Sequence, residues 1–314
     1  MKEKNSVMRR IVENMSRVII GKEGPARLMV IALASAGHIL IEDVPGIGKT
    51  TMANSMAKSV GLSFNRIQFT PDILPSDITG FTIFNQKTGE FEYRSGNVMS
   101  NVILADEINR TSPKTQASML EVMEERQVTV DGKTYSVPNP FMVIATQNPV
   151  EYMGTYPLPE AQMDRFMMRI SVGYPSHAEE VDILYRFQET NPLNNLEPVV
   201  TRDELLELQQ QVRKVRVDRS LAGYIVDLIT ATRRHEHVML GCSPRASLSL
   251  FRAAQAAAMY DGRDYVLPED IRDLAVPVLS HRLVLKQEAK IKRISSESIV
   301  MDIVERQKIP VGIK

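Results

Sequence analysis

Lys49 and Thr50 stand at the end of a turn whose residue types are suited to binding a polyphosphate. They follow Gly46 and Gly48 in the segment 43–50, DVPGIGKT, which matches most of the pattern G-x-x-x-x-G-K-[ST]. The glycines let backbone N–H groups turn toward phosphates, and the helix that follows presents its positive end to them. Lys49 would reach the β- and γ-phosphate oxygens, and the Thr50 hydroxyl would bind Mg²⁺. The segment therefore predicts binding of ATP with Mg²⁺.

The first glycine of that pattern is replaced by Asp43. We expect the replacement to be tolerated, because Asp adopts unusual backbone angles more readily than most residues and Pro45 stiffens the loop. Pro45, Ile47 and Thr51 flank the matching residues and are included as candidate nucleotide contacts.

Two adjacent carboxylates, Asp106 and Glu107, end a buried strand predicted at 101–105. An acidic strand end on its own is usually a solvated turn. After a phosphate-binding loop it favours a hydrolytic site, in which Asp106 holds Mg²⁺ through water and Glu107 activates the attacking water. Adjacent residues at a strand end point in different directions, so the two carboxylates can serve the metal and the γ-phosphate separately.

Two further polar residues follow predicted strands or helices. Asn148 follows the apolar segment 141–145, where it could hydrogen-bond the γ-phosphate and the lytic water, although an Asn-Pro turn is the simpler interpretation. Arg165 follows a short helix just before the last strand, and taken alone it would be interpreted as a surface salt bridge.

The elements that must position these residues alternate between strands and helices. Apolar strand segments occur at 38–42, 64–69, 101–105, 141–145 and 167–172, and the intervening segments show helical spacing. The segment 7–37 is predicted to be helical, with a break at 19–21. The alternation predicts an α/β domain built on a mostly parallel sheet with helices on both faces.

Two segments interrupt this alternation and are predicted to be β-hairpins, at about 81–94 and 127–138. The first pairs 82–84 with 91–93. The second pairs 128–130 with 135–137 around Asp131-Gly132, which is a strong hairpin-turn dipeptide. Ordinary edge hairpins are the alternative to a functional role.

The pattern becomes helical after Ser176. The capping boxes Ser176-x-x-Glu179 and Thr201-x-x-Glu204 each predict a helix start, and 191–198 has the composition of a linker. We therefore expect an α/β nucleotide-binding core at 1–190 and an all-helical domain at 199–314. Pro277 should kink or end the helix in which it falls.

Composition limits the classes of partner and compartment. The 38 Lys and Arg residues balance 38 Asp and Glu residues, so no net charge draws the chain to nucleic acid. The single cysteine, Cys242, excludes an internal disulfide and favours the cytoplasm. No apolar run is long enough to span a bilayer, so we expect neither a membrane span nor secretion.

Taken in order, these motifs resemble an AAA+ ATPase, and most closely the MoxR family. The resemblance extends from about residue 18 to about residue 285. It is carried by the segments 43–50, LADEINR at 104–110, EVMEERQV at 121–128, ATQNP at 145–149 and LPEAQMDRF at 158–166.

The resemblance implies roles that the residues alone do not give. It implies that Ile20 and Gly21 help hold the adenine, that Asn148 is a sensor residue, and that Arg245, near the start of a helix, clamps the phosphates together with Lys49. Arg165 would be an arginine finger that acts on a neighbouring subunit, because in this fold it cannot easily reach its own nucleotide. The second domain would be a lid, with ATP and Mg²⁺ between it and the core.

The resemblance also implies a homo-oligomeric ring, a hexamer, whose hairpins face the central channel or a partner. Its function would be chaperone-like remodelling or maturation of a protein complex driven by Mg-dependent ATP hydrolysis, with a partner that carries a von Willebrand factor A domain. Two alternatives stay open: a nucleic-acid translocase of the same clade, and a nucleotide-gated scaffold with slow hydrolysis.

Overall fold

A parallel five-stranded sheet forms the centre of the N-terminal part of the chain. The computed structural model describes residues 2–148 and 154–310. The sheet has the strand order β2-β5-β8-β1-β9, and every neighbouring pair is parallel. Its strands are β1 (Ile39–Glu42), β2 (Phe64–Gln68), β5 (Val102–Asp106), β8 (Met142–Gln147) and β9 (Met168–Ile170). The predicted α/β class with a parallel sheet is confirmed.

Helices cover both faces of the sheet because alternate strand residues point to opposite sides. Ile39 and Ile41 belong to one hydrophobic cluster and Leu40, between them, belongs to the other. The first cluster includes residues of α1 (Lys2–Ser16), α2 (Glu23–Ala34) and α3 (Lys49–Ser59), and the second includes residues of α4 (Pro75–Thr79) and α5 (Pro113–Glu125). The predicted helical segment 7–37 is thus two helices, α1 and α2.

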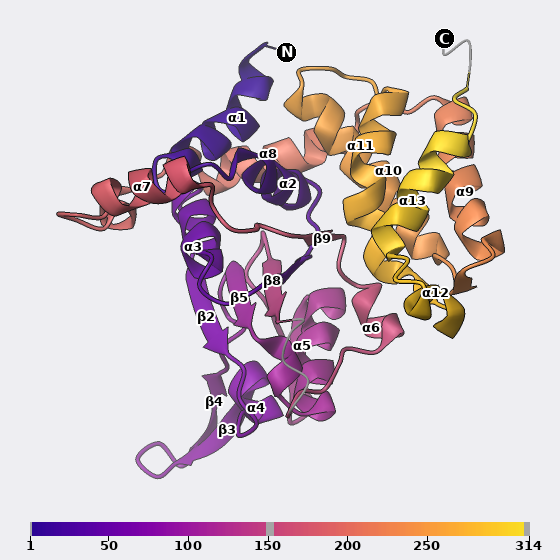
Figure 1. Ribbon diagram of the computed structural model, residues 1–314. Coiled ribbons are helices and arrows are strands. Elements are labelled where there is room, and N and C mark those ends of the chain that lie inside the picture. The colour runs from indigo at the N-terminus through magenta and orange to yellow at the C-terminus, as the bar shows by residue number, and fades with distance from the viewer. Residues whose placement is uncertain (1, 149–153, 311–314) are drawn as a thin grey trace.

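The C-terminal helices form a second body that packs on the first (Figure 1). They are α8 (Arg202–Val212), α9 (Arg219–Arg234), α10 (Pro244–Tyr260), α11 (Pro268–Leu279), the 3₁₀ helix η3 (Ser280–Arg282), α12 (Gln287–Ile291) and α13 (Ser296–Arg306). α10 contacts α1 and α2, and its buried residues belong to the same hydrophobic cluster as theirs. This continuous apolar contact holds the C-terminal body against the α1–α2 side of the core.

The C-terminal body is not all-helical as predicted. It contains a small antiparallel pair, β10 (Val238–Leu240) with β11 (Val284–Leu285). Sequence periodicity missed this pair because two and three residues are too few to show alternation.

Predicted helix ends agree with the structure where side chains cap them. The hydroxyls of Ser112, Ser176 and Thr201 accept hydrogen bonds from backbone N–H groups at the starts of α5, α7 (His177–Arg186) and α8, and the two predicted capping boxes are complete. Pro277 lies inside α11, which ends two residues later at Leu279. No helix in residues 2–148 or 154–310 has the length and apolarity needed to cross a bilayer.

Two antiparallel hairpins lie outside the central sheet. The first, β3 (Gly80–Asn85) with β4 (Glu90–Ser95), extends away from the sheet in Figure 1. The second, β6 (Gln127–Val130) with β7 (Lys133–Ser136), turns at Asp131 and Gly132, which both have positive φ, as a two-residue I′ turn requires. The first hairpin has the predicted pairing of 82–84 with 91–93. In the second, 128–130 pair with 133–135 instead of the predicted 135–137, because the two-residue turn at Asp131 and Gly132 lets β7 begin at Lys133.

His38 joins three elements just before β1. Its Nδ1 accepts a hydrogen bond from the Val143 N–H of β8 (2.9 Å), and its Nε2 donates to the Met123 carbonyl of α5 (3.1 Å). A ring nitrogen that accepts is unprotonated, so this arrangement requires neutral histidine. Burial lowers the pKa of His38 to about 4, against a smaller opposing effect of the Met123 carbonyl.

We predict that His38 makes the fold sensitive to acid. The unfolded chain binds a proton at this site below pH 6.5, whereas the folded chain does so only near pH 4. The free energy of unfolding should therefore fall by about 3 kcal/mol as the pH drops from 6.5 to 4. Urea unfolding at pH 7.5 and 5.0 should measure about 2 kcal/mol of this loss, because the folded chain begins to bind the proton only below pH 5. His38→Gln should have a lower free energy of unfolding at pH 7.5, but that free energy should change less with pH than in the wild type. His177 is exposed, so His177→Gln should keep the wild-type dependence of the free energy of unfolding on pH. Equal slopes for all three proteins would contradict the assignment.

Candidate functional site

The phosphate-binding loop and the acidic strand end meet at the carboxyl edge of the sheet. β8 lies between β1 and β5, so Asn148 falls between the loop that follows β1 and the carboxylates that follow β5. The Asp43 N–H donates to the Gln147 carbonyl (3.3 Å), which extends the β1–β8 pairing into the loop. Ligands of doubly wound sheets bind at this edge.

The loop has an open backbone cradle at its two glycines. Gly46 and Gly48 have φ of +83° and +86°, and an added Cβ at either position would meet no atom within 4 Å. Gly48 directly precedes α3, whose first residue is Lys49. Free N–H groups at a helix start beside open space suit a phosphate group.

Asp43 anchors the loop through its side chain. Among the described residues it is not one with positive φ, so the expected reason for its tolerance, an unusual backbone angle, is wrong. Its Oδ2 instead accepts hydrogen bonds from Ser171 Oγ (2.9 Å), Val172 N (2.8 Å) and Gly173 N (2.7 Å). Burial acts to raise the pKa of Asp43, but these hydrogen bonds and that from Val44 lower it below its usual value. The carboxylate therefore ties the loop to the segment that leaves β9.

Asp106 is held in place by two neighbouring strands. Thr146 Oγ1 of β8 donates to Oδ1 (2.6 Å), and Arg66 Nη2 of β2 pairs with Oδ2 (2.6 Å). Sequence reasoning missed both partners. The signal that could have identified them is that Arg66 and Thr146 are polar or charged residues within strands β2 and β8.

Glu107 adopts a left-handed backbone conformation, with φ 57° and ψ 48°. Such a conformation in a non-glycine residue is uncommon and is often found at functional sites. Its N–H donates to Thr146 Oγ1 (2.8 Å), and its Oε2 accepts from Gln68 Nε2 (2.8 Å) and pairs with Arg110 Nε (3.1 Å). The change of backbone direction separates the Glu107 carboxylate from that of Asp106.

Lys49 faces these acidic groups. Its Nζ donates to the Asp43 carbonyl (2.8 Å). Burial lowers the pKa of Lys49, and the charges of Asp106, Asp43 and Glu107 oppose that effect. The ammonium and the three carboxylates thus share one electrostatic environment.

The oxygen groups at this edge fit a magnesium ion. Mg²⁺ prefers hard oxygen ligands and usually keeps several waters. The Asp106 carboxylate lies at the end of β5, and the half-buried Thr50 hydroxyl lies in the first turn of α3. These two groups have the chemistry that Mg²⁺ bound to a nucleotide would require.

The predicted adenine contacts lie between the α1–α2 connection and α7. Gly21 has φ of +68°, and a Cβ there would overlap the Glu179 carboxylate of α7. Lys22 Nζ donates to the Tyr174 carbonyl (2.8 Å), which fixes the same connection to the segment before α7. Ile20 is half-buried. Asn148 is buried at the end of β8, and Pro149 of the same motif lies outside the described residues.

Arg165 and Arg245 lie together at the opposite edge of the sheet. Both pair with Glu124, at the end of α5: Arg165 Nη2 with Oε2 (3.2 Å) and Arg245 Nη2 with Oε1 (2.5 Å). The preceding residue, Met123, contacts His38 at the amino end of β1, whereas the phosphate-binding loop follows the carboxyl end. β1 has four residues, so the edges are roughly 13 Å apart.

The position of Arg245 differs from the one that the resemblance implied, in which it clamps the phosphates together with Lys49 of the same chain. In this structure Arg245 lies beside Glu124 and Lys49 beside the Asp43 carbonyl, at opposite edges of the sheet, so the two residues of one chain are not placed to contact the same phosphates. The resemblance suggested a lid over the nucleotide, but the apolar contact of α10 with α1 and α2 sets the start of α10 beside Arg165 instead.

The edge that carries the two arginines is hollow and cationic. A pocket of about 240 Å³ there is lined by Arg126, Arg165, Arg245 and Arg252, with Glu124 and Asp164 as its carboxylates. The excess of positive charge suits an anionic group.

Comparisons with known proteins agree with this arrangement. The family model described as "ATPase family associated with various cellular activities (AAA)" matches residues 38–168, and a model of the AAA lid domain matches residues 230–303. The protein named Chaperone MoxR1 from Mycobacterium tuberculosis is 42% identical over 96% of this chain and 82% of its own length. The chain belongs to the MoxR family of AAA+ ATPases.

Other relatives of this MoxR protein cover nearly its whole length. The Bacillus subtilis protein YeaC is 54% identical over 96% of this chain and 94% of its own. A crystal structure of a candidate ATPase from Cytophaga hutchinsonii superposes with a TM-score of 0.92 at 41% identity, covering 98% of this chain and 96% of that one. The predicted AAA+ fold with a helical lid is confirmed, and the MoxR chain is a nucleotide-binding ATPase.

Proposed function

We propose that this chain is one subunit of a ring that hydrolyses ATP at the boundaries between subunits. The main support for this proposal is that the candidate site residues lie in two separate groups. Lys49, Asp106 and Glu107 lie at the carboxyl edge of the sheet, whereas Arg165 and Arg245 lie at the amino edge. A complete site would therefore need two chains, and the family resemblance favours a hexamer.

The carboxyl edge would bind the nucleotide and activate water. The backbone around Gly46 and Gly48, with Thr51 in the first turn of α3, would donate to phosphate oxygens, and Pro45 and Ile47 would shape the loop. Glu107 would accept a proton from the attacking water, and Asn148 would orient that water. Ile20 and Gly21 would hold the adenine.

Thr50 and Asp106 would hold Mg²⁺. When bound, the ion would neutralise the charge of the phosphate oxygens. Both groups provide the oxygen ligands that Mg²⁺ prefers, which supports the proposal.

The amino edge would supply the cations for the neighbouring subunit. Arg165 would act as an arginine finger on the neighbour's γ-phosphate, and Arg245 would contact the same triphosphate from the lid. The shared Glu124 carboxylate holds the two guanidinium groups together, which supports a joint role.

The work done by this ATPase would be chaperone-like remodelling or maturation of a protein complex. Support comes from the relative named as a chaperone and from the β3–β4 hairpin. Phe84 and Phe91 near its tip form an edge-to-face pair and stay 53% and 72% exposed. Exposed aromatic side chains suit a protein surface better than a phosphate backbone, which calls for Lys and Arg.

A partner with a von Willebrand factor A domain would couple the ring to its client. Steady-state ATPase rates measured alone, with such a partner and with single-stranded DNA would test this function. Stimulation by the partner is expected. Stimulation by DNA alone would favour a translocase, and a slow rate insensitive to both would favour a nucleotide-gated scaffold.

The division of the chain and its location are also proposals. A core at 1–190 and a lid at 199–314 agree with the separate matches of the AAA and lid models. The single buried Cys242 is consistent with a reducing compartment such as the cytoplasm.

Lys49→Ala is expected to weaken ATP binding. Losing a charged hydrogen bond to phosphate costs about 2–3 kcal/mol, or roughly 30- to 150-fold in Kd. Titration with a fluorescent ATP analogue measures the change. Lys58→Ala, in the same helix but bonded to the Leu193 carbonyl, is the matched control and should bind normally. Equal affinities for both variants would remove Lys49 from the site.

A further inference from the structure

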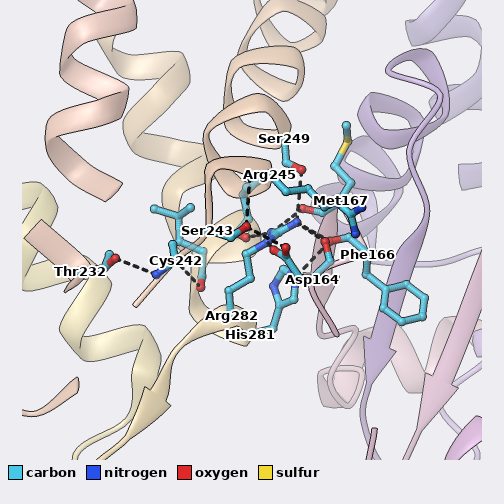
Figure 2. Close-up of polar contacts among 12 residues, drawn as sticks. Asp164, Phe166, Met167, Thr232, Cys242, Ser243, Arg245, Ser249, His281 and Arg282 are labelled. Atoms are coloured by element: carbon cyan, nitrogen blue, oxygen red, sulfur yellow. Dashed lines mark hydrogen bonds and ion pairs between the residues drawn. The ribbon is translucent and has the colours of Figure 1, made fainter. Parts of the chain in front are cut away.

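Two side chains of the lid hydrogen-bond Asp164, the residue before Arg165. Both oxygens of the Asp164 carboxylate accept hydrogen bonds from lid side chains: Oδ1 from Arg282 Nε (2.8 Å) and Oδ2 from Ser243 Oγ (2.7 Å) (Figure 2). The Arg282 side chain is only 2% exposed and that of Asp164 is 19% exposed. The carboxylate is therefore held inside the contact between core and lid.

Arg282 also binds the backbone on both sides of Arg165. Its Nη2 donates to the carbonyls of Phe166 (2.6 Å) and Asp164 (3.3 Å), and its Nη1 donates to the Met167 carbonyl (3.2 Å). A planar guanidinium presents its donors in a rigid fork. One lid residue thus sets the course of the chain that carries the arginine finger.

Ser243 connects the same carboxylate to Arg245. Its hydroxyl caps α10 by accepting from the Arg245 N–H (3.1 Å), while it donates to Asp164. Asp164 is therefore one residue from Arg165 in the chain and one hydrogen bond from the residue that caps the helix of Arg245. Both arginine side chains then converge on Glu124.

Net stability is a weak explanation for this network. A buried ion pair gains little over well-packed apolar residues, because the cost of removing both charges from water offsets their attraction. What a fully bonded network gives is a single geometry for the groups it joins.

We propose that Asp164, Ser243 and Arg282 are positioning residues that hold Arg165 and Arg245 as one unit facing the neighbouring subunit's triphosphate. The orientation of the lid in one subunit would then control hydrolysis in the next. This inference rests on the proposed function, in which the two arginines act on a neighbour.

Rings assembled from two different variants can test the proposed function and the positioning role separately. Glu107→Gln chains keep their arginines but lack the base, and Arg165→Ala chains keep the base but lack the finger. Neither should hydrolyse ATP alone, whereas the mixture should recover activity at boundaries where an Arg165→Ala site meets an intact arginine. Absence of recovery would overturn the proposed function itself.

Ser243→Ala is then added to one chain type at a time. In the Glu107→Gln chain, which donates the arginines, it should lower the recovered kcat about 10-fold, because small misplacements of catalytic groups are costly. In the Arg165→Ala chain it should have little effect. Ser243→Thr keeps the hydroxyl and should restore the rate. Arg282→Lys, which keeps the charge without the fork, should act like Ser243→Ala.

Thr201→Ala removes a comparable helix cap, at α8, with no bond to Asp164, and it is the matched control. Equal losses whichever chain carries Ser243→Ala would overturn the inference while leaving the proposed function intact. A loss of the same size from Thr201→Ala in the donating chain would also overturn it, since general loosening of the lid would then explain the effect.

Discussion

Arg165→Ala is expected to lower kcat of the assembled protein about 10³-fold while leaving ATP affinity within a few-fold of wild type. The arginine lies at the amino edge of the sheet, and the roughly 13 Å length of β1 separates that edge from the edge at which the phosphate-binding loop of its own chain begins. Its removal should therefore spare the binding half of the site. Steady-state hydrolysis gives kcat and equilibrium binding gives the ATP affinity, and both are measured on the same preparation.

The control for Arg165 is Arg202→Ala, an exposed arginine that bonds only the Asn139 carbonyl among the described contacts. It should retain full activity. The assignment fails if Arg165→Ala hydrolyses ATP at the wild-type rate at protein concentrations where sedimentation shows a ring. It also fails if the wild-type chain is fully active as a monomer, because no neighbour is then needed.

Glu107→Gln is expected to bind ATP normally and to hydrolyse it about 10³-fold more slowly. Glutamine keeps the size of the side chain and can still bond Gln68, but it cannot accept a proton from water. Single-turnover hydrolysis of radiolabelled ATP isolates the chemical step from product release. The stalled protein should also retain its partner and client longer than wild type in a pull-down.

A matched carboxylate tests the specificity of that loss. Glu125→Gln lies at the end of α5, away from the loop, and should leave the single-turnover rate unchanged. Normal turnover by Glu107→Gln would assign the base to another group.

The local chemistry of the carboxyl edge could be predicted because it depends on neighbours in sequence. The predicted strands agree with the observed ones to within two residues at each end, and parallel strands must bring Lys49, Asp106 and Asn148 to a common edge. The hairpin turn at Asp131-Gly132 was equally predictable, since that dipeptide tolerates positive φ.

Contacts between distant segments could not be predicted in this way. The role of Asp43 depends on where the chain leaves β9, and Thr146 and Arg66 reach Asp106 only because β8 and β2 flank β5. The place of Arg245 depends on how α10 packs against α1 and α2. No local spacing encodes these long-range partners.

The state of Cys242 makes the chain convenient for site-directed labelling. It is the only cysteine in the sequence, it is 1% exposed, and burial raises the pKa of its thiol to about 11. At neutral pH such a thiol is almost entirely protonated and reacts slowly with maleimides. A cysteine introduced at exposed Lys87, at the tip of the first hairpin, could therefore receive a fluorophore while the native residue is left in place.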